Sequence, residues 1–383
     1  MEPIYLDFAA TTPVREEVRT AMASCLAETF GNPSSIHRWG RAADDVLEGA
    51  RAEAAAALGA RPREILFVRG GTESDHLALL GWCGAERELG RRPTLVVSAV
   101  EHHAVLGAAE AAEQQGARVT SLDVTPAGAL DFEAAARALA SGPALASIMW
   151  VNNETGMVLP LREIVDLAAE RSALVHTDAA QAVGKVAVDV RDVPVDLLSA
   201  TGHKIYGPKG TGLLFVREGT PLAPLLRGGG QERGLRPGTE DVAGAVGLAT
   251  ALRLAVGEQR TEAARLEGLR DRLAARLTRS IEGVRINAVE ATRAPHVLSV
   301  GFLGIEDGSA LVMALDIEGV AVSGGSACSS GASQSSHVIR ALYGPDDRRA
   351  TVRFSFGRGS DEAGVDRAAR ATADIVGKMR AAA

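Results

Sequence analysis

The 383-residue sequence contains little cysteine and little lysine, and it has no excess of positive charge. Its three cysteines, Cys25, Cys83 and Cys328, are too few and too widely spaced for a disulfide framework or a zinc site built from CxxC pairs. A reducing compartment such as the cytoplasm is therefore the expected location, and no metal site is expected.

Positive charge and long apolar runs are also missing. Asp and Glu outnumber Lys and Arg by 48 to 41, so the chain has no overall positive field that would hold nucleic acid or an anionic membrane. No apolar run approaches the roughly 20 residues of a membrane-spanning helix, and the first residues lack the pattern of an export signal. We expect no direct contact with nucleic acid or membrane.

Lysine is the rarer of the two strong bases. The lysines are Lys185, Lys204, Lys209 and Lys378, and arginine supplies the rest of the positive charge. Where arginine is preferred for general surface charge, an individual lysine is more often needed for its amine.

From about residue 61, short apolar runs alternate with Ala-rich stretches of helical period, as in a series of β-strand and α-helix units. This pattern predicts an α/β fold in which helices flank a mostly parallel, seven-stranded sheet. The strands are expected at residues 65–69, 94–99, 118–124, 144–151, 173–177, 195–200 and 212–216.

A long helical stretch at 240–281 leads to a smaller C-terminal α+β domain. Its strands are expected at 297–302, 320–323 and 351–356, and its helices at 309–317 and from 361 to the end. We predict a large domain of residues 16–258. Residues 1–15 and 259–383 form the small domain, which carries Cys328 and Arg353.

Ligands of open α/β sheets bind beyond the carboxyl ends of the strands, where two segments can hold an anion or a ring. Gly71 and Thr72 open a helix directly after a strand, so backbone N–H groups there can bind a phosphate, although a simple capping turn fits as well. His102 and His103 follow the next strand. An imidazole there can stack on a ring or transfer protons, but one capping and one solvated histidine is an equally good interpretation.

Two further strand ends carry an acid and an amine. Asp178, with Gln181 close behind it, ends one strand, and taken alone it is best explained as a helix cap. Lys204 follows the next strand, after Thr201 and His203. A phosphate site, an acid, an imidazole and an amine at one edge of a sheet together indicate pyridoxal phosphate rather than a nicotinamide cofactor.

Cys328 lies in a stretch of Gly and Ser that offers no apolar face to bury a thiol, whereas Cys25 and Cys83 lie on apolar helical patterns. A functional nucleophile is the better interpretation of Cys328.

Segments along nearly the whole chain, between residues 5 and 358, resemble the cysteine desulfurases. These belong to the aminotransferase class V group and have the fold-type I pyridoxal phosphate architecture. The segments are, in order, YLDFAATTP, FGNPSS, GGTESD, EHHAV, VNNETG, HTDAAQAVGK, TGHKIYGPKG, GGGQERGLRPGTE, SGGSACSSG and RFSFGR.

The resemblance implies roles for the reactive residues. Lys204 is expected to bond covalently to the cofactor and to remove the substrate's Cα proton, while Asp178 pairs with the pyridine nitrogen. His102 stacks on the ring, and Arg353 pairs with the substrate carboxylate. Cys328 is expected to take the sulfur.

The resemblance also implies a set of binding residues. Gln181 and Asn153 bond the phenolic oxygen, and Thr72, Thr201 and His203 hold the phosphate, which Thr239 reaches from the other subunit of a homodimer. The expected cofactor-binding residues are Gly71, Thr72, His102, Asn153, Asp178, Gln181, Thr201, His203, Lys204 and Thr239. The expected substrate-binding residues are Asn32, Asn153 and Arg353.

The implied function is removal of sulfur from L-cysteine, which yields L-alanine and a persulfide on Cys328. The sulfur then passes to an acceptor protein, such as an iron–sulfur scaffold or a carrier for tRNA thiolation, or to thio-cofactor synthesis. A selenocysteine lyase or another class V aminotransferase-like enzyme would use the same Lys204 and Asp178. A non-catalytic assembly subunit is the alternative from a different class, although such a protein tends to lose the lysine, aspartate and thiol that are present here.

Overall fold

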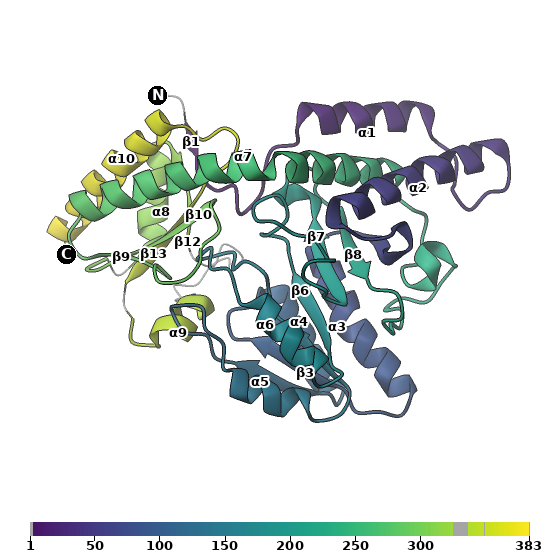
Figure 1. Ribbon diagram of the computed structural model, residues 1–383. Coiled ribbons are helices and arrows are strands. Elements are labelled where there is room, and N and C mark those ends of the chain that lie inside the picture. Colours follow the sequence, from purple (N-terminus) through teal and green to yellow (C-terminus); the bar gives the residue numbers. More distant parts are fainter. Residues whose placement is uncertain (1–2, 306, 325–335, 348, 383) are drawn as a thin grey trace.

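The computed structural model describes residues 3–305, 307–324, 336–347 and 349–382 (Figure 1). Within these residues one sheet has the strand order β2-β8-β7-β6-β5-β3-β4. Its neighbouring strands are parallel except where β8 pairs with β2 and β7. The predicted seven-stranded, mostly parallel sheet is therefore confirmed. Its strands are β2 (Ile65–Val68), β3 (Thr94–Ser98), β4 (Arg118–Leu122), β5 (Ala144–Ser147), β6 (Leu174–Asp178), β7 (Leu197–Thr201) and β8 (Gly212–Val216).

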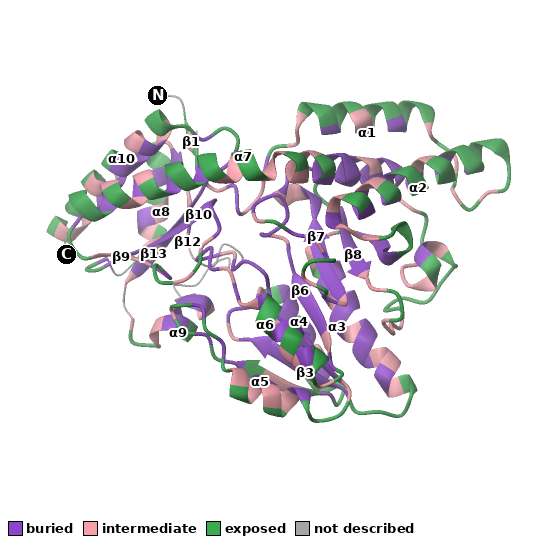
Figure 2. Cartoon of the chain, viewed as in Figure 1, coloured by how far each residue is buried: buried purple, intermediate pink, exposed green. Residues whose placement is uncertain are grey.

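Helices cover the large sheet and explain its continuous apolar strands. Strands β3, β5 and β7 are buried along their whole length, and Figure 2 shows the large sheet mainly in the colour of buried residues. A sheet covered on both faces has this pattern, whereas a half-exposed sheet alternates. The helices are α1 (Glu16–Glu28), α2 (Arg38–Leu58), α3 (Gly71–Glu88), α4 (His103–Gln114), α5 (Phe132–Leu139) and α6 (Leu161–Ala169).

Helix α7 (Val242–Ser280) crosses the upper part of the molecule in Figure 1 and joins its two parts. Its first half packs on α1 and α2, and its second half packs on α10. The second part contains an antiparallel sheet of strand order β12-β13-β10-β9 and a short parallel pair, β1-β11. Its strands are β1 (Ile4–Tyr5), β9 (Val284–Ile286), β10 (Val297–Phe302), β11 (Val320–Ala321), β12 (Ser323–Gly324) and β13 (Ala350–Ser355). Its helices are α8 (Gly308–Ile317), α9 (His337–Tyr343) and α10 (Glu362–Ala382).

The apolar cores follow this arrangement. Leu6 and Leu266 belong to the core of the small sheet, whereas Val18 and Leu252 belong to a core of the large sheet. The core therefore changes along α7 and near the start of the chain. The division into residues 16–258 and residues 1–15 with 259–383 stays a proposal, because Ala288, Val338 and Leu342 of the second part pack into the core of the large sheet.

Two predicted strands of the large sheet end at least two residues earlier in the structure than the sequence suggests. Strand β4 ends at Leu122 and β5 at Ser147, although apolar residues continue beyond both. After β5 the chain enters a turn in which Asn152 Oδ1 accepts the N–H groups of Glu154 and Thr155 at 3.0 and 2.8 Å. Backbone hydrogen bonds to β6 continue as far as Trp150, whose N–H donates to Asp178 O at 3.0 Å, and the polar turn follows. Strands β1 and β9 and helices α2 and α9 were not predicted. All but α2 are short, and such short elements show no clear periodicity.

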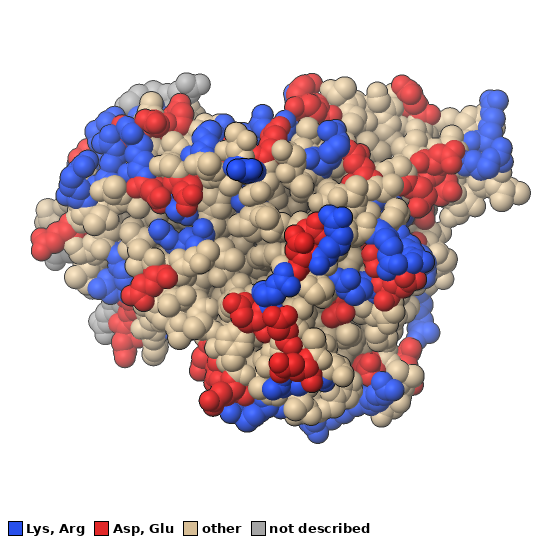
Figure 3. All heavy atoms as spheres, in the orientation of Figure 1, with Lys and Arg blue, Asp and Glu red and all other residues tan. Residues whose placement is uncertain are grey.

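Charged side chains of both signs are interspersed on the face shown in Figure 3. Basic residues gather over the second half of α7 and over α10, where Arg272 and Arg276 both reach the carboxylate of Asp366. Within the described part of the chain, no helix has the length and apolar character needed to span a membrane.

Candidate active site

A pocket of about 340 Å³ lies at the carboxyl ends of the large sheet, where the strands meet the small domain. Most of the side chains singled out from the sequence line it. They are Gly71, Thr72, His102, Asn153, Asp178, Gln181, Thr201, His203, Lys204 and Arg353. The tertiary structure therefore brings together residues that are spread over most of the chain.

Of the predicted residues that the structure describes, Asn32 and Thr239 do not line this pocket. Cys328 lies outside the described residues. Asn32 is exposed in the connection between α1 and α2, where its Oδ1 accepts the Ser34 N–H at 2.9 Å. Thr239 is exposed as well. Within one chain, both Asn32 and Thr239 therefore lie outside the pocket. This is the position that Thr239 would need if it reached the phosphate bound by a second subunit.

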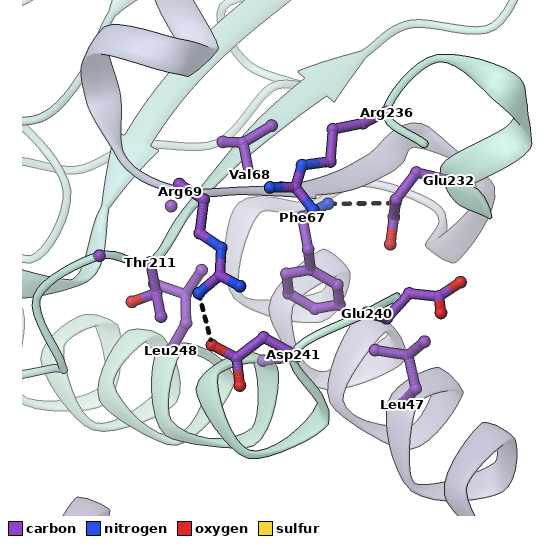
Figure 4. Close-up of a pocket in the computed structure, with 13 residues that line it drawn as sticks. Leu47, Phe67, Val68, Arg69, Thr211, Glu232, Arg236, Glu240, Asp241 and Leu248 are labelled. Carbon is purple, nitrogen blue, oxygen red and sulfur yellow. Dashed lines mark hydrogen bonds and ion pairs between the residues drawn. The ribbon is translucent and has the colours of Figure 1, made fainter. Parts of the chain in front are cut away.

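The segment around Thr239 is held on both sides. Arg236 Nε donates to Glu73 Oε1 at 3.0 Å, on helix α3. Arg69 Nη1 donates to Asp241 Oδ2 at 3.1 Å (Figure 4). These contacts hold the two ends of the segment 236–241, which contains Thr239, against α3 and the residue that follows β2.

The candidate anion site is the turn between β2 and α3. Gly70 has φ 139°, a value that L side chains rarely adopt. Gly212 on β8 is also required, because a Cβ there would lie 2.7 Å from Gly70 Cα. The turn presents the first backbone N–H groups of α3, which have no acceptor within the helix, next to the hydroxyls of Thr72 and Thr201.

His102 is the N-cap of α4. Its Nδ1 accepts the Ala104 N–H at 3.1 Å, which leaves Nε2 as the protonated nitrogen of the neutral ring. Burial lowers the pKa of His102, Asp178 opposes this effect, and Lys204 adds to it. The ring is therefore held neutral, as a ring that stacks on an aromatic cofactor would be.

Asp178 and Gln181 lie at the end of β6. Asp178 Oδ1 accepts the Ala180 N–H at 2.9 Å. The Gln181 amide donates to Ala9 O at 2.9 Å and lies 3.1 Å from His296 Nε2 through its oxygen. Both side chains are therefore fixed before any ligand arrives.

Lys204 ends the short 3-10 helix η2 (Gly202–Lys204), directly after β7. Its Nζ donates to the carbonyl oxygens of Ala9 and Ala10 at 2.6 and 2.8 Å. Tyr206 follows with φ 65°, an uncommon conformation for a bulky residue, and its N–H donates to Thr12 Oγ1 at 2.7 Å. The N-terminal segment thus lies against the loop that presents the amine.

Arg353 comes from β13 of the small sheet and forms the opposite wall. Its Nη1 donates to Asn153 O at 2.8 Å, and its Nη2 lies 2.9 Å from Asp7 Oδ1. Nε finds no acceptor among the described residues, although the side chain is buried. The guanidinium lines the pocket, and a cation in a pocket wall is suited to a carboxylate ligand.

Sequence reasoning missed three buried acids around this pocket, Asp75, Glu101 and Glu154. Burial raises the pKa of Glu101 to about 8 and that of Glu154 to about 7. Each acid lies in a segment that resembles the cysteine desulfurases, but it carried no signal of its own, because acids are usually solvated. Burial alone distinguishes them.

The residues present fit pyridoxal phosphate. The pocket offers an amine at Lys204, an acid at Asp178, a neutral imidazole at His102 and the N-terminal end of α3 for an anion. The guanidinium of Arg353 supplies a cation in the pocket wall for a substrate carboxylate.

Comparison with known proteins agrees with this geometry. Residues 4–368 match the model of the family Aminotransferase class-V. The putative cysteine desulfurase IscS 1 of Bacillus subtilis is 42% identical over 381 residues, which is 99% of this chain and 100% of that protein. A solved structure of a NifS-like protein has a TM-score of 0.90 at 33% identity and covers 98% of this chain and 100% of its own. The structure of SspA in complex with cysteine has a TM-score of 0.79 at 33% identity, and covers 92% of this chain and 98% of its own. The chain belongs to the cysteine desulfurases of the aminotransferase class-V family.

Proposed function

We propose that this protein is a pyridoxal-phosphate-dependent cysteine desulfurase, which converts L-cysteine to L-alanine and retains the sulfur on Cys328. The observation that carries this proposal is the convergence of Lys204, Asp178, His102 and Arg353 on one pocket. The similar structure that was solved with cysteine supports the choice of substrate.

Pyridoxal phosphate is the cofactor of this family, and several groups are placed to hold it. The N-terminal end of α3, with Thr72, Thr201 and His203, would bind the phosphate. Asp178 would meet the pyridine nitrogen, and His102 would cover one face of the ring. The bound cofactor withdraws electrons from the Cα of an attached amino acid, which makes its Cα proton acidic.

The chain's own residues orient the substrate and move its protons. Arg353 would bind the carboxylate of cysteine through a planar, charge-assisted pair of hydrogen bonds. Lys204, released from covalent attachment when substrate enters, would take the Cα proton at Nζ and return a proton to the product. The carbonyl groups of Ala9 and Ala10, which already accept from Nζ, would steer the amine.

Cys328 is proposed as the sulfur acceptor on the basis of its sequence context. Its thiolate would attack the sulfur of the bound cysteine, so that an S–S bond forms while the Cβ–S bond breaks. The electron pair of the broken bond stays with the carbon, which gains a proton and leaves as alanine. The products are alanine and a Cys328 persulfide, so atoms and electrons balance.

Finer features belong to the same proposal. We propose a cytoplasmic homodimer in which Thr239 of one subunit reaches the phosphate bound by the other. The sulfur would pass to an acceptor protein, such as an iron–sulfur scaffold or a tRNA-thiolation carrier. The exposed position of Thr239, in a segment held at both ends, supports this arrangement.

The test is anaerobic incubation of the purified protein with L-cysteine and a reducing thiol, followed by quantification of alanine and sulfide. Equal amounts of both are expected from the wild-type protein, and neither from Cys328→Ala. Cys25→Ala is the matched control, because Cys25 is buried on α1 and should leave both products unchanged. Normal turnover by Cys328→Ala would contradict the role of Cys328, and absence of both products from the wild type would contradict the proposed reaction.

A further inference from the structure

Asp75 lies at the base of the pocket, and the proposed reaction has no use for it. It lies in α3, lines the pocket, and its side chain is 1% exposed. Polar atoms of Asp75, His102 and Asp178 lie within 4.8 Å of one another. Asp75 Oδ1 has no hydrogen-bond partner among the described residues. A carboxyl group so placed beside another carboxyl group requires an explanation.

The nearest imidazole does not provide a counter-charge. His176 Nε2 lies 3.6 Å from Asp75 Oδ1, but it lies closer, at 3.0 Å, to Ser199 Oγ. The other nitrogen of the ring lies 2.8 Å from Ser147 Oγ. Burial lowers the pKa of His176 to about 3, so the ring is neutral at physiological pH.

The other titratable groups around Asp75 also disfavour a second negative charge. Asp178 faces it from β6, while Glu101 and His102 face it from the segment before α4, and His102 is itself held neutral. Burial raises the pKa of Asp75 well above its usual value, and repulsion from Asp178 and Glu101 adds to this, while a hydrogen bond with Ser199 opposes it. Two buried carboxyl groups this close share a proton rather than both ionise.

The two acids differ in what stabilises their charged forms. Asp178 Oδ1 accepts the Ala180 N–H at 2.9 Å, and a backbone donor favours the ionised form. Asp75 has an oxygen without such a donor. The proton therefore belongs on Asp75.

We propose that Asp75 is a positioning residue that holds the one proton of the Asp75–Asp178 pair and so leaves Asp178 as the ionised member that faces the cofactor ring. This inference rests on the proposed function, because it assigns Asp178 to the pyridine nitrogen. An ionised Asp178 keeps that nitrogen protonated. A proton that was shared by the two acids, or that lay on Asp178, would not have this effect.

Infrared difference spectroscopy of the holoenzyme in D₂O at neutral pH tests the position of the proton. Spectra are compared for wild type, Asp75→Asn and Asp178→Asn. Glu101 and Glu154, whose pKa values are also raised, contribute carbonyl bands that should be the same in all three proteins. One further carbonyl band of a protonated carboxylic acid is expected to be lost in Asp75→Asn and retained in Asp178→Asn. Loss in Asp178→Asn, or no change in either variant, would overturn the proposal. Asp178→Asn reports on the same proton from the other partner, so the test holds even if Asp75→Asn fails to fold.

Cofactor affinity supplies a second readout. Asp178→Asn removes a charge-assisted contact and is expected to raise the dissociation constant of pyridoxal phosphate at least about 10-fold. Asp75→Asn keeps a neutral group of the same shape and is expected to change it by less than about 3-fold. Equal weakening by the two variants would contradict the assignment. A wild-type protein that binds the cofactor and shows the band pattern but releases no alanine would instead contradict the proposed function.

Discussion

The base and the wall of the pocket handle buried charge in different ways. The base contains the acids Asp75 and Glu101, whose pKa values burial raises, so they stay neutral by holding protons. The wall contains Arg353, which cannot lose its proton and is instead paired with Asp7 and with a backbone carbonyl. The difference follows from chemistry, because a carboxyl group can discharge itself in a low-dielectric site and a guanidinium cannot.

This comparison has a functional consequence. When the neighbouring acids at the bottom of the pocket are neutral, Asp178 carries the negative charge that pairs with a cationic ring nitrogen. A wall with a permanent cation is ready for an anionic substrate group. Variants that add or remove a single charge in either region should therefore act on different steps.

The largest effect is expected from Lys204→Ala, at the end of the large sheet that forms the bottom of the pocket. Without the amine, the protein loses covalent attachment of the cofactor and the group that moves the Cα proton, so kcat should fall by at least about 10³-fold. Borohydride reduction followed by mass spectrometry measures the attachment, and alanine release measures turnover. Lys209→Ala is the matched control. Retention of cofactor on reduced Lys204→Ala would show that another residue carries it.

The wall is tested by Arg353→Gln. The variant loses charge-assisted hydrogen bonds to the substrate carboxylate, so KM for cysteine should rise about 10- to 100-fold, while the cofactor remains bound. Steady-state kinetics and the visible spectrum separate the two effects. A normal KM together with weakened cofactor binding would mean that Arg353 contributes to binding of the cofactor and not of the substrate.

The protonated acid Glu101 should make the folded protein less stable as pH rises. Glu101 has its pKa raised to about 8, so between about pH 4.5 and pH 8 the folded state binds a proton that the unfolded state has lost. The free energy of unfolding from this group therefore decreases through that window. Glu101→Gln, which keeps an acceptor for the Ser98 hydroxyl and the Met149 N–H, should flatten the decrease.

Urea unfolding at pH 5.5 and pH 8 measures this slope. The same slope in Glu101→Gln and in the wild type would show that Glu101 is ionised in the folded protein. Glu110→Gln, on the surface of α4, controls for the loss of a carboxylate.

The smallest effect is expected from Asp7→Asn. Asp7 is the partly exposed partner of Arg353, and asparagine can still accept a hydrogen bond, so the cost to stability should be only about 1 kcal/mol. KM should change less than in Arg353→Gln, because the guanidinium remains. Thermal unfolding and kinetics check both points, and a KM change as large as that of Arg353→Gln would mean that Asp7 positions the arginine for binding.

The candidate site was largely predictable because strand ends are visible in the sequence. Asp178, Thr201 and Lys204 follow apolar runs, and parallel strands deliver such positions to one edge. Asp75 was not predictable in this way. It lies within a helix, and only the packing of α3 against β6 and β7 excludes solvent from its side chain.

The sequence alone determined the α/β order of elements and the residues at the strand ends, because local periodicity and turn chemistry act over a few residues. Its long-range similarity to a known family added the roles expected of those residues. Only the tertiary structure decided that Arg353 of the small sheet lines the same pocket as the strand ends of the large sheet. It likewise decided that the carbonyl groups of Ala9 and Ala10 accept hydrogen bonds from Lys204. It also decided which acids are buried, since desolvation depends on the packing of segments far apart in the chain.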